Sequence, residues 1–300
     1  MITKCSKLFF TKFVLASPLL CIFFTESVAS SVTNQDIQTF TEKILNEDNS
    51  GLSDLVRYNR QGKAQSTRDS ASQPLLNVDG RALENPTVKA LMALFDNYDP
   101  DVTHPEVVTH IEKLEESAFI NAVMKTKVMQ STYEFLTEKG LFRGDQGSFK
   151  HWLAQIWFSL YSRGFRERGS SAFEHVFLGE IKNHQVSGLH NWIYFNNQEK
   201  SGTLNYMGWK HYLDFGKGSL VKVHFTWNDV DKPVSSLFVG TSPELELALY
   251  SVCYLARPGN ACQISLNRKP LVIISHTFQG PNSQKLIGSI YPEVLRRNSY

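Results

Sequence analysis

Residues 171–180 read SAFEHVFLGE and residues 188–192 read GLHNW, and this stretch separates two parts of the chain that have different patterns. Before it, apolar residues recur at the three- and four-residue spacing of amphipathic helices. After it, short apolar runs alternate with turn residues, as in antiparallel strands. This order predicts an α+β fold, with a helical lobe over about residues 31–165 and a strand-rich lobe over about residues 170–300.

The first part is predicted to form helices separated by polar segments. Helical tracts are expected at residues 31–60, 87–95, 103–139 and 149–161. The third tract is expected to begin at a capping box, THPE, in which the Thr103 hydroxyl and the Glu106 carboxylate bind free backbone N–H groups. Gly140 is its expected end. The polar residues 61–80 predict a surface loop.

The second part is predicted to consist mainly of strands. They are expected at residues 191–195, 203–209, 220–227, 236–240, 270–276 and 286–291. A helix is expected to begin in the segment TSPE at residues 241–244, because proline is tolerated and a glutamate is favourable in the first turn. Lys232 is expected on a turn at the start of a strand.

The first thirty residues have the pattern of a secretory signal peptide. Lys4, Lys7 and Lys12 give a basic start, residues 13–24 are apolar and uncharged, and residues 27–30 are small. The apolar run is too short to span a bilayer, so an uncleaved anchor is the less favoured alternative. No later segment is apolar for long enough to span a membrane. The sequence therefore predicts a secreted protein that begins near residue 31.

Cleavage at this point changes the charge and the cysteine content. The chain has 31 basic and 29 acidic residues, and removal of three lysines and one glutamate leaves 28 of each. An anionic partner must then be bound by a local patch rather than by an overall positive field. Cys253 and Cys262 are the two cysteines that remain, and they flank the turn signal at residues 258–260. An oxidising compartment favours a disulfide between them over two free thiols.

The sequence contains neither a His-Glu-x-x-His zinc motif nor a Gly-x-Ser-x-Gly nucleophile motif. On a strand, Glu174 and Glu180 would lie on one face and His175 on the other, so these residues do not predict a tight metal site. A weak effect of a divalent ion through the carboxylates stays open. A serine or cysteine hydrolase has little support.

Two histidines and a lysine offer a different chemistry. His175 and His190 titrate near neutral pH, so one can accept a proton while the other donates one. With Lys232 to stabilise phosphoryl charge, such a pair can cleave RNA: the ribose 2′-OH attacks the adjacent phosphorus, and the 5′ oxygen departs with a proton. This route does not cut DNA, which lacks the 2′-OH. A single histidine beside apolar residues is more often a structural residue, so the residues alone leave ribonuclease activity as one possibility.

Four separated blocks of the sequence resemble the EndoU family of uridylate-specific endoribonucleases, also described as poly(U)-specific. The blocks are SAFEHVFLGE at residues 171–180, GLHNW at residues 188–192, KPVSSLFVGTSPE at residues 232–244 and IGSIYP at residues 287–292. The resemblance covers about residues 36–297. It implies a helical lobe packed beside a lobe of antiparallel sheets that carries the active site.

The resemblance also implies an activity, which is the cleavage of single-stranded RNA at uridines to leave 2′,3′-cyclic phosphate ends. His175, His190 and Lys232 match the catalytic residues of the family, and Glu174 and Glu180 match the carboxylates that support them. From the residues we predict that His190 is the base and His175 the acid. Manganese is the cofactor that the resemblance implies, although no metal ligands are assigned.

Three further positions match residues of the family that bind the substrate: Ser236, Ser289 and Tyr291. Tyr291 can stack on a base, and Ser289 can form a hydrogen bond with a pyrimidine edge. Ala172 and Leu189 depart from the residues more usual in the family, and so does Ser289, where threonine is common. These departures affect fine specificity more than activity. The expected partner is single-stranded RNA that contains uridine, and the protein is expected to be a monomer. A non-catalytic secreted RNA- or protein-binding member of the same fold is the alternative.

Overall fold

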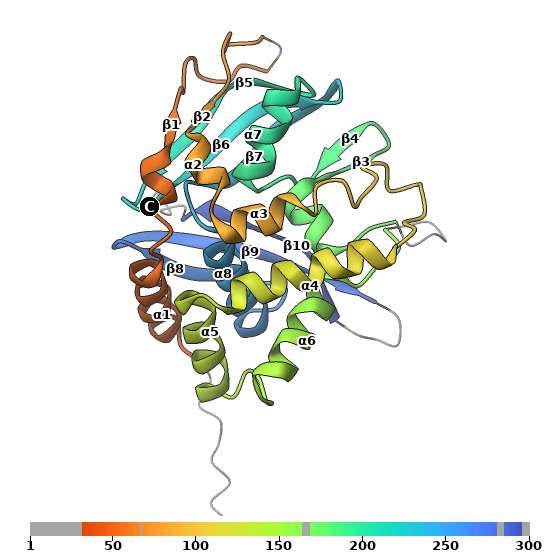
Figure 1. Ribbon diagram of the computed structural model, residues 1–300. Coiled ribbons are helices and arrows are strands. Elements are labelled where there is room, and N and C mark those ends of the chain that lie inside the picture. Colours follow the sequence, from red (N-terminus) through yellow and green to blue (C-terminus); the bar gives the residue numbers. More distant parts are fainter. Residues whose placement is uncertain (1–31, 67, 164–168, 281–284, 296–300) are drawn as a thin grey trace, which may run out of the picture. The chain divides into compact units, whose positions relative to one another are not determined.

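The β structure of the protein is divided among small antiparallel sheets (Figure 1). The computed structural model describes residues 32–66, 68–163, 169–280 and 285–295. The strands in these ranges are β1 (Val56–Tyr58), β2 (Leu76–Val78), β3 (Glu180–Lys182), β4 (Gln185–Ser187), β5 (Leu204–Asp214), β6 (Ser219–Trp227), β7 (Val230–Val239), β8 (Ala261–Leu266), β9 (Lys269–Gln279) and β10 (Lys285–Val294). They pair as β1-β2, β3-β4, β5-β6-β7 and β8-β9-β10.

Helices precede, separate and support these sheets. They are α1 (Asn34–Glu47), α2 (Gly80–Leu83), α3 (Pro86–Met92), α4 (His110–Met124), α5 (Lys127–Glu138), α6 (Gln146–Phe158), α7 (Trp192–Ser201) and α8 (Pro243–Ala256). A 3₁₀ turn (η1) covers Leu52–Leu55, and a π-helical turn (η2) covers Glu174–Leu178. The α+β fold predicted from the sequence is therefore confirmed.

Helix α8 lies at the centre of the fold. It is mostly apolar, and the residues from Pro243 to Tyr254 are buried, as expected for a helix with no face in water. It contacts helices α3, α4 and α5 and strands β9 and β10 (Figure 1). The structure joins Cys253 in this helix to Cys262 in β8. Helix α8 therefore links the helices to one of the three-stranded sheets.

Helix α1 packs on β8, far away in the sequence. The Thr41 hydroxyl donates a hydrogen bond to the Ser265 carbonyl at 2.9 Å and accepts one from the Ser265 N–H at 3.1 Å. Lys217 donates hydrogen bonds to the carbonyls of Leu45, Asn46 and Asp48, and so satisfies acceptors at the C-terminal end of this helix. Residues 31–300 form one compact unit. The division into two lobes stays a prediction.

The predicted helix over residues 103–139 is wrong in its start and in its continuity. The capping box lies six residues later, where Thr109 and Glu112 bind each other's backbone N–H groups and open α4. Glu106 instead accepts a hydrogen bond from the Asp99 N–H at 2.7 Å. The tract is also broken before α5, because the Thr126 hydroxyl donates to the Val123 carbonyl and accepts from the Met129 N–H. These side-chain hydrogen bonds compete with continuous helix.

The strand predicted at residues 191–195 is also wrong, because this segment begins helix α7. The Asn191 side chain accepts from the N–H groups of Ile193 and Tyr194, both at 3.1 Å, and Gly202 ends the helix with a φ of 79°. The aromatic and β-branched residues favour a strand locally, and the two caps override that preference.

Other boundaries move as well. The predicted helix over residues 31–60 ends at Glu47, and β1 and β2 lie where a helix end and a loop were expected. Strand β8 was missed. Lys232 lies inside β7 rather than on a turn. The turn precedes it at Asn228 and Asp229, whose φ values of 47° and 60° are those of a tight hairpin turn.

The predicted signal peptide, residues 1–30, lies outside the described residues. Across the part of the chain that the structure describes, none of the helices is both long and apolar enough to cross a bilayer.

Candidate active site

The first histidine lies on the π-helical turn η2. The N–H of Gly179 donates to the Glu174 carbonyl at 2.7 Å, five residues back, and this wider turn distinguishes the segment from an α-helix or a strand. Gly179 ends the turn with a φ of 95°, a value that favours glycine. The segment therefore presents His175 differently from the strand geometry considered in the sequence analysis.

Backbone hydrogen bonds hold the second histidine against the first. The N–H groups of Leu189 and His190 donate to the carbonyls of His175 and Val176 at 3.1 and 2.8 Å. This approach requires Gly188, which has a φ of 68°, because a Cβ there would lie 1.6 Å from the His175 carbonyl oxygen. Leu189 follows with a φ of 60°, an uncommon value for a residue with a side chain. The glycine brings the two catalytic candidates together.

His175 is paired with a buried carboxylate. Its Nδ1 lies 2.6 Å from Glu180 Oε2, so Nδ1 carries the proton and donates it to the carboxylate. Burial lowers the pKa of His175, while the charge of Glu180 and this hydrogen bond act in the opposite direction. Burial opposes ionisation of Glu180, but His175, Arg163 and Ser170 together lower its pKa. The carboxylate is therefore ionised at neutral pH and partly offsets the effect of burial, and the pKa of His175 stays below its ordinary value.

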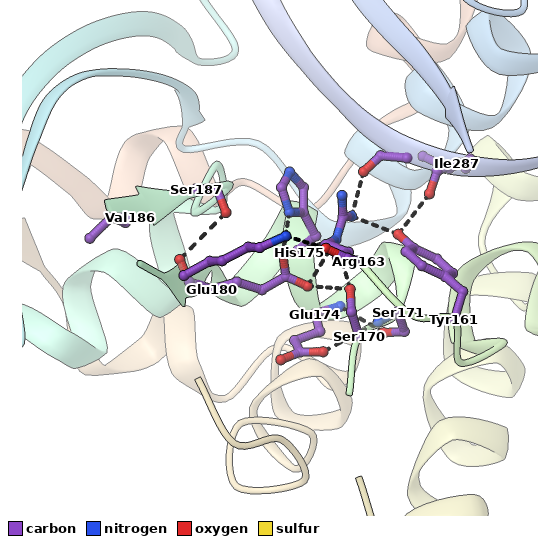
Figure 2. Close-up of polar contacts among 12 residues, drawn as sticks. Tyr161, Arg163, Ser170, Ser171, Glu174, His175, Glu180, Val186, Ser187 and Ile287 are labelled. Atoms are coloured by element: carbon purple, nitrogen blue, oxygen red, sulfur yellow. Dashed lines mark hydrogen bonds and ion pairs between the residues drawn. The ribbon is translucent and has the colours of Figure 1, made fainter. Parts of the chain in front are cut away.

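Arg163 and Ser170 complete the surroundings of Glu180 (Figure 2). Arg163 Nε lies 3.0 Å from Glu180 Oε2 and 2.8 Å from Ser170 Oγ. The Ser170 hydroxyl donates to Glu180 Oε1. These contacts fix the plane of the carboxylate and with it the orientation of the His175 ring.

His190 has a neutral environment. Its Nδ1 lies 2.7 Å from the Ser236 carbonyl oxygen, which can only accept, so Nδ1 carries the proton and Nε2 is free to act as a base. Burial lowers the pKa of His190 to about 3, and the charge of Lys232 adds to this effect. The ring stacks on that of Tyr291 with a centroid distance of 5.0 Å. At neutral pH His190 is therefore an uncharged acceptor.

Lys232 acts on both histidines, because its charge contributes to the lowered pKa of each. It projects from β7, and its Nζ donates to the Val186 carbonyl at 2.9 Å, which ties it to the β3-β4 hairpin. Burial lowers its pKa to about 8. The ammonium group remains mostly protonated at neutral pH and can serve as a partner for an anion.

Glu174, the neighbour of His175 in the sequence, is fully buried. One of its oxygens accepts from the Ser171 N–H at 3.2 Å, and Oε1 has no hydrogen-bond partner among the described residues. Burial and repulsion by Glu180 raise its pKa well above the ordinary value. Its surroundings therefore favour the neutral form of Glu174, whereas those of Glu180 favour the ionised form, although the two bracket the same histidine.

The predicted substrate-binding residues lie on β7 and β10. Ser289 and Tyr291 are half-buried on β10, where the pairing with β9 shifts between Ile287 and Ser289. This shift is a β-bulge at Gly288, and bulges re-aim side chains near functional sites. Ser236 is buried and contributes its carbonyl to His190. The structure therefore brings Tyr291 and Ser236 into contact with His190.

The implied manganese ion does not fit these side chains. Both oxygens of Glu180 are used by His175, Ser170 and Arg163, and one oxygen of Glu174 is used by Ser171. Within the described ranges, no group of three or more histidine, cysteine, aspartate or glutamate side chains is placed to hold a metal.

Arg163 and Ser170 were missed by the sequence analysis. Arg163 lies outside any periodic pattern, and its partner Glu180 is 17 residues away. Ser170 immediately precedes the SAFEHVFLGE segment, so its proximity to the histidine was a usable signal. A buried carboxylate that pairs with a histidine also needs donors for its second oxygen, and this requirement could have directed a search for them.

The fold and the site define an α+β protein with an acid–base site in which one histidine is neutral and the other is paired with a carboxylate. The sequence matches the model of the family described as "Endoribonuclease XendoU" over residues 36–292. The chain therefore belongs to this family of endoribonucleases, as the motifs predict.

Relatives and a solved structure agree with this assignment. The chain is 38% identical to "Uridylate-specific endoribonuclease EndoU" of Drosophila melanogaster, over 87% of this chain and 83% of the relative. It is 36% identical to "Uridylate-specific endoribonuclease" of Homo sapiens, over 88% of this chain and 67% of the relative. The solved structure of XendoU, described as a splicing-independent snoRNA processing endoribonuclease, aligns with a TM-score of 0.74 and 32% identity, over 88% of this chain and 99% of that one.

Proposed function

We propose that this endoribonuclease cleaves single-stranded RNA at uridines by attack of the ribose 2′-OH, leaving 2′,3′-cyclic phosphate and 5′-OH ends. The observation that carries the proposal is the opposite pairing of the two histidines. His190 donates to a carbonyl, whereas His175 donates to a carboxylate. Family membership and the names of the relatives support RNA as the substrate and uridine as the base.

His190 is the general base in this proposal. Its Nδ1 proton is held by the Ser236 carbonyl, which leaves Nε2 with a free lone pair. Its lowered pKa keeps the ring neutral at any pH near neutrality. Nε2 takes the proton of the 2′-OH as that oxygen forms a bond to phosphorus.

His175 is the general acid. The ionised Glu180 stabilises the imidazolium form, as a carboxylate does for a histidine that must carry a proton during a reaction. The proton on Nε2 passes to the 5′ oxygen as its bond to phosphorus breaks. The pentavalent phosphoryl group carries extra negative charge in between, and the Lys232 ammonium stabilises it. DNA is not a substrate because it has no 2′-OH.

Ser289 and Tyr291 on β10, with Ser236, form the proposed uridine site. A seryl hydroxyl can donate to a uracil carbonyl and accept from the uracil N3–H. One face of Tyr291 is already stacked on His190, so a base can contact only the remaining face or the edge of this ring.

The test uses an oligoribonucleotide with one uridine, the same oligomer with that ribose replaced by 2′-deoxyribose, and end-group analysis of the products. We expect the wild type to give a cyclic phosphate from the ribo-oligomer and to leave the deoxy-substituted bond intact. His190→Ala should lose at least about three orders of magnitude in rate. His184→Ala serves as the control, because His184 is an exposed residue on the turn between β3 and β4. Cleavage of the deoxy-substituted bond, or a 5′-phosphate product, would exclude this mechanism.

We also propose that manganese stimulates cleavage and that the protein is secreted. The mature protein keeps the disulfide and is a monomer in this proposal. Manganese is tested by the cleavage rate with added Mn²⁺ and with a chelator. If the proposed histidine chemistry is correct, cyclic phosphate forms in both conditions. Export is tested by finding the N-terminus near residue 31 in secreted material, and the oligomeric state by light scattering.

A further inference from the structure

Arg163 contacts two parts of the site that have separate roles in the proposed function, the Glu180 carboxylate and strand β10. On one side it pairs with Glu180, the carboxylate that orients His175. On the other side its Nη2 donates to the Gly288 carbonyl and, at 2.6 Å, to the Tyr161 hydroxyl. Figure 2 shows the guanidinium between the Glu180 carboxylate and the strand that carries Ile287.

The second side leads directly to β10. The Tyr161 hydroxyl donates to the Ile287 carbonyl at 3.0 Å. Together, Arg163 and Tyr161 therefore bind the carbonyls of Ile287 and Gly288, the two residues at the β-bulge that precedes Ser289. The bulge sets the direction in which the Ser289 side chain leaves the strand.

The geometry points to Arg163 as a positioning residue that couples the acid–base pair to uridine recognition. This inference rests on the proposed function. One planar guanidinium orients Glu180, and through it His175, while it also fixes the bulge that aims Ser289. Arginine suits this task because its donors form a rigid fork, whereas lysine has one point of charge.

The other contacts of Arg163 support the rigidity of this arrangement. Its guanidinium carbon lies 5.0 Å from the centre of the Tyr161 ring, and that ring stacks on Phe278 of β9 with a centroid distance of 4.5 Å. The side chain of Arg163 is 17% exposed and that of Glu180 is fully buried. A loss of the fork would therefore remove one donor from the buried Glu180 carboxylate and the Arg163 donor from the Gly288 carbonyl.

The experiment compares kcat/KM for two oligoribonucleotides that differ only in having uridine or cytidine at the cleavage site, between about pH 5 and pH 9. Arg163→Gln removes the fork and the charge. We expect the uridine-to-cytidine ratio to fall about tenfold, which corresponds to the loss of one well-placed hydrogen bond. We also expect the alkaline limb to move to higher pH, because the charge of Arg163 lowers the pKa of His175.

Two further variants separate the sides. Arg163→Lys keeps the charge, so the ratio should fall while the alkaline limb stays in place. Tyr161→Phe removes the hydroxyl that donates to β10 and accepts from Arg163, and it keeps the charge of Arg163 and the ring against Phe278, so it should also lower the ratio without moving the limb. Arg143→Gln, at an exposed arginine, is the control and should change neither.

The outcomes distinguish this inference from the proposed function. A wild type that cleaves neither oligomer contradicts the proposed function itself. The wild type can also prefer uridine while Arg163→Gln and Tyr161→Phe lose activity equally on both oligomers and keep the wild-type pH profile. That result would show that Arg163 is only structural. Thermal unfolding of each variant identifies a folding defect, and Tyr161→Phe and Arg163→Lys still decide the question if Arg163→Gln does not fold.

Discussion

The two histidines of this site have the same side chain and a similar degree of burial, yet their surroundings differ in kind. His175 is 6% exposed and faces an ionised carboxylate, whereas His190 is 7% exposed and faces a main-chain carbonyl. Burial favours the neutral form of both. The carboxylate opposes that effect for His175 and nothing of comparable strength does so for His190. Burial lowers the pKa of both histidines, and the partner of Nδ1 makes the imidazolium form less unfavourable for His175 than for His190.

In the proposed mechanism, this difference allows one site to supply an acid and a base at the same pH. A neutral acceptor needs no counter-ion, so main-chain carbonyls suffice for His190. A proton donor needs a stabilised positive charge, and in a buried site that requires a carboxylate with its own donors. The longer polar network around His175 follows from that requirement.

We expect the largest effect from a change that disturbs the surroundings of His175 and His190 at once. Gly188→Ala would add a Cβ only 1.6 Å from the His175 carbonyl oxygen, at a residue whose φ is 68°. We expect cleavage to become undetectable and the free energy of unfolding to fall by about 3 kcal/mol or more, measured by urea denaturation. Gly202→Ala is the control, because Gly202 has a similar φ of 79° and no atom within 4 Å of the added Cβ. It should cost about 1 kcal/mol and leave the site active. Equal effects of the two changes would contradict the role given to Gly188.

Glu180→Gln should break the His175 side alone. The amide is the same size but has no charge, so the imidazolium of His175 loses its stabilisation and the pKa of His175 falls further. We expect kcat/KM to drop by about two to three orders of magnitude, with the alkaline limb moved to lower pH. Glu199→Gln, at a carboxylate that binds the N–H groups of Leu75 and Leu76, should keep the wild-type pH profile. A normal limb in Glu180→Gln would refute the pairing.

Lys232→Arg tests the cation that both sides share. In the wild type, kcat/KM should fall with a slope of one above the pKa of His175 and steepen to a slope of two above about pH 8, where Lys232 loses its proton. Arginine stays charged, so the variant should keep the first decline and lose the second. Its rate at neutral pH should lie within about tenfold of the wild type. Persistence of the steeper slope in the variant would assign that proton to another group.

Glu246→Gln should have the smallest effect and would sharpen the description of the His190 side. Burial raises the pKa of Glu246 to about 8, and its carboxyl group accepts from Asn191 Nδ2 at 3.3 Å, directly beside His190. A raised pKa in the folded state gives stability that is complete below the ordinary value near 4.5 and is lost as the pH rises toward 8. The wild type should therefore lose roughly 5 °C more in Tm between acidic and alkaline pH than the variant. Parallel Tm curves would mean that this carboxyl group is ionised in the folded state.

The sequence was sufficient for the α+β class, and it also singled out the candidate catalytic residues, for a different reason. Alternation in residues 220–227 reflects one buried face of β6, and that physical pattern is local. The histidines and Lys232 stood out because their block order matches a family, and their pairing in space could not be derived from spacing. The proposed assignment of acid and base rests on the partners of Nδ1, which only the structure gives.

Local reasoning failed where two local preferences competed or where the decisive contact was distant. Residues 191–195 favour a strand by composition, and the caps at Asn191 and Gly202 favour a helix. The pattern of a capping box occurs twice within ten residues, and only the second one opens α4. Arg163 binds Gly288, 125 residues away, and no pattern near either residue predicts that contact.

The packing of α1 on β8 has a consequence for the order in which the protein can fold during synthesis. Helix α1 can pack on α5 early, through the stack of Phe40 on Phe135, but its second partner β8 is far away in the sequence, since Thr41 and Ser265 are 224 residues apart. Strand β10, with its bulge and Tyr291, emerges later still. The strand that carries Tyr291 is thus among the last described segments to be synthesised, and the candidate site can form only after it.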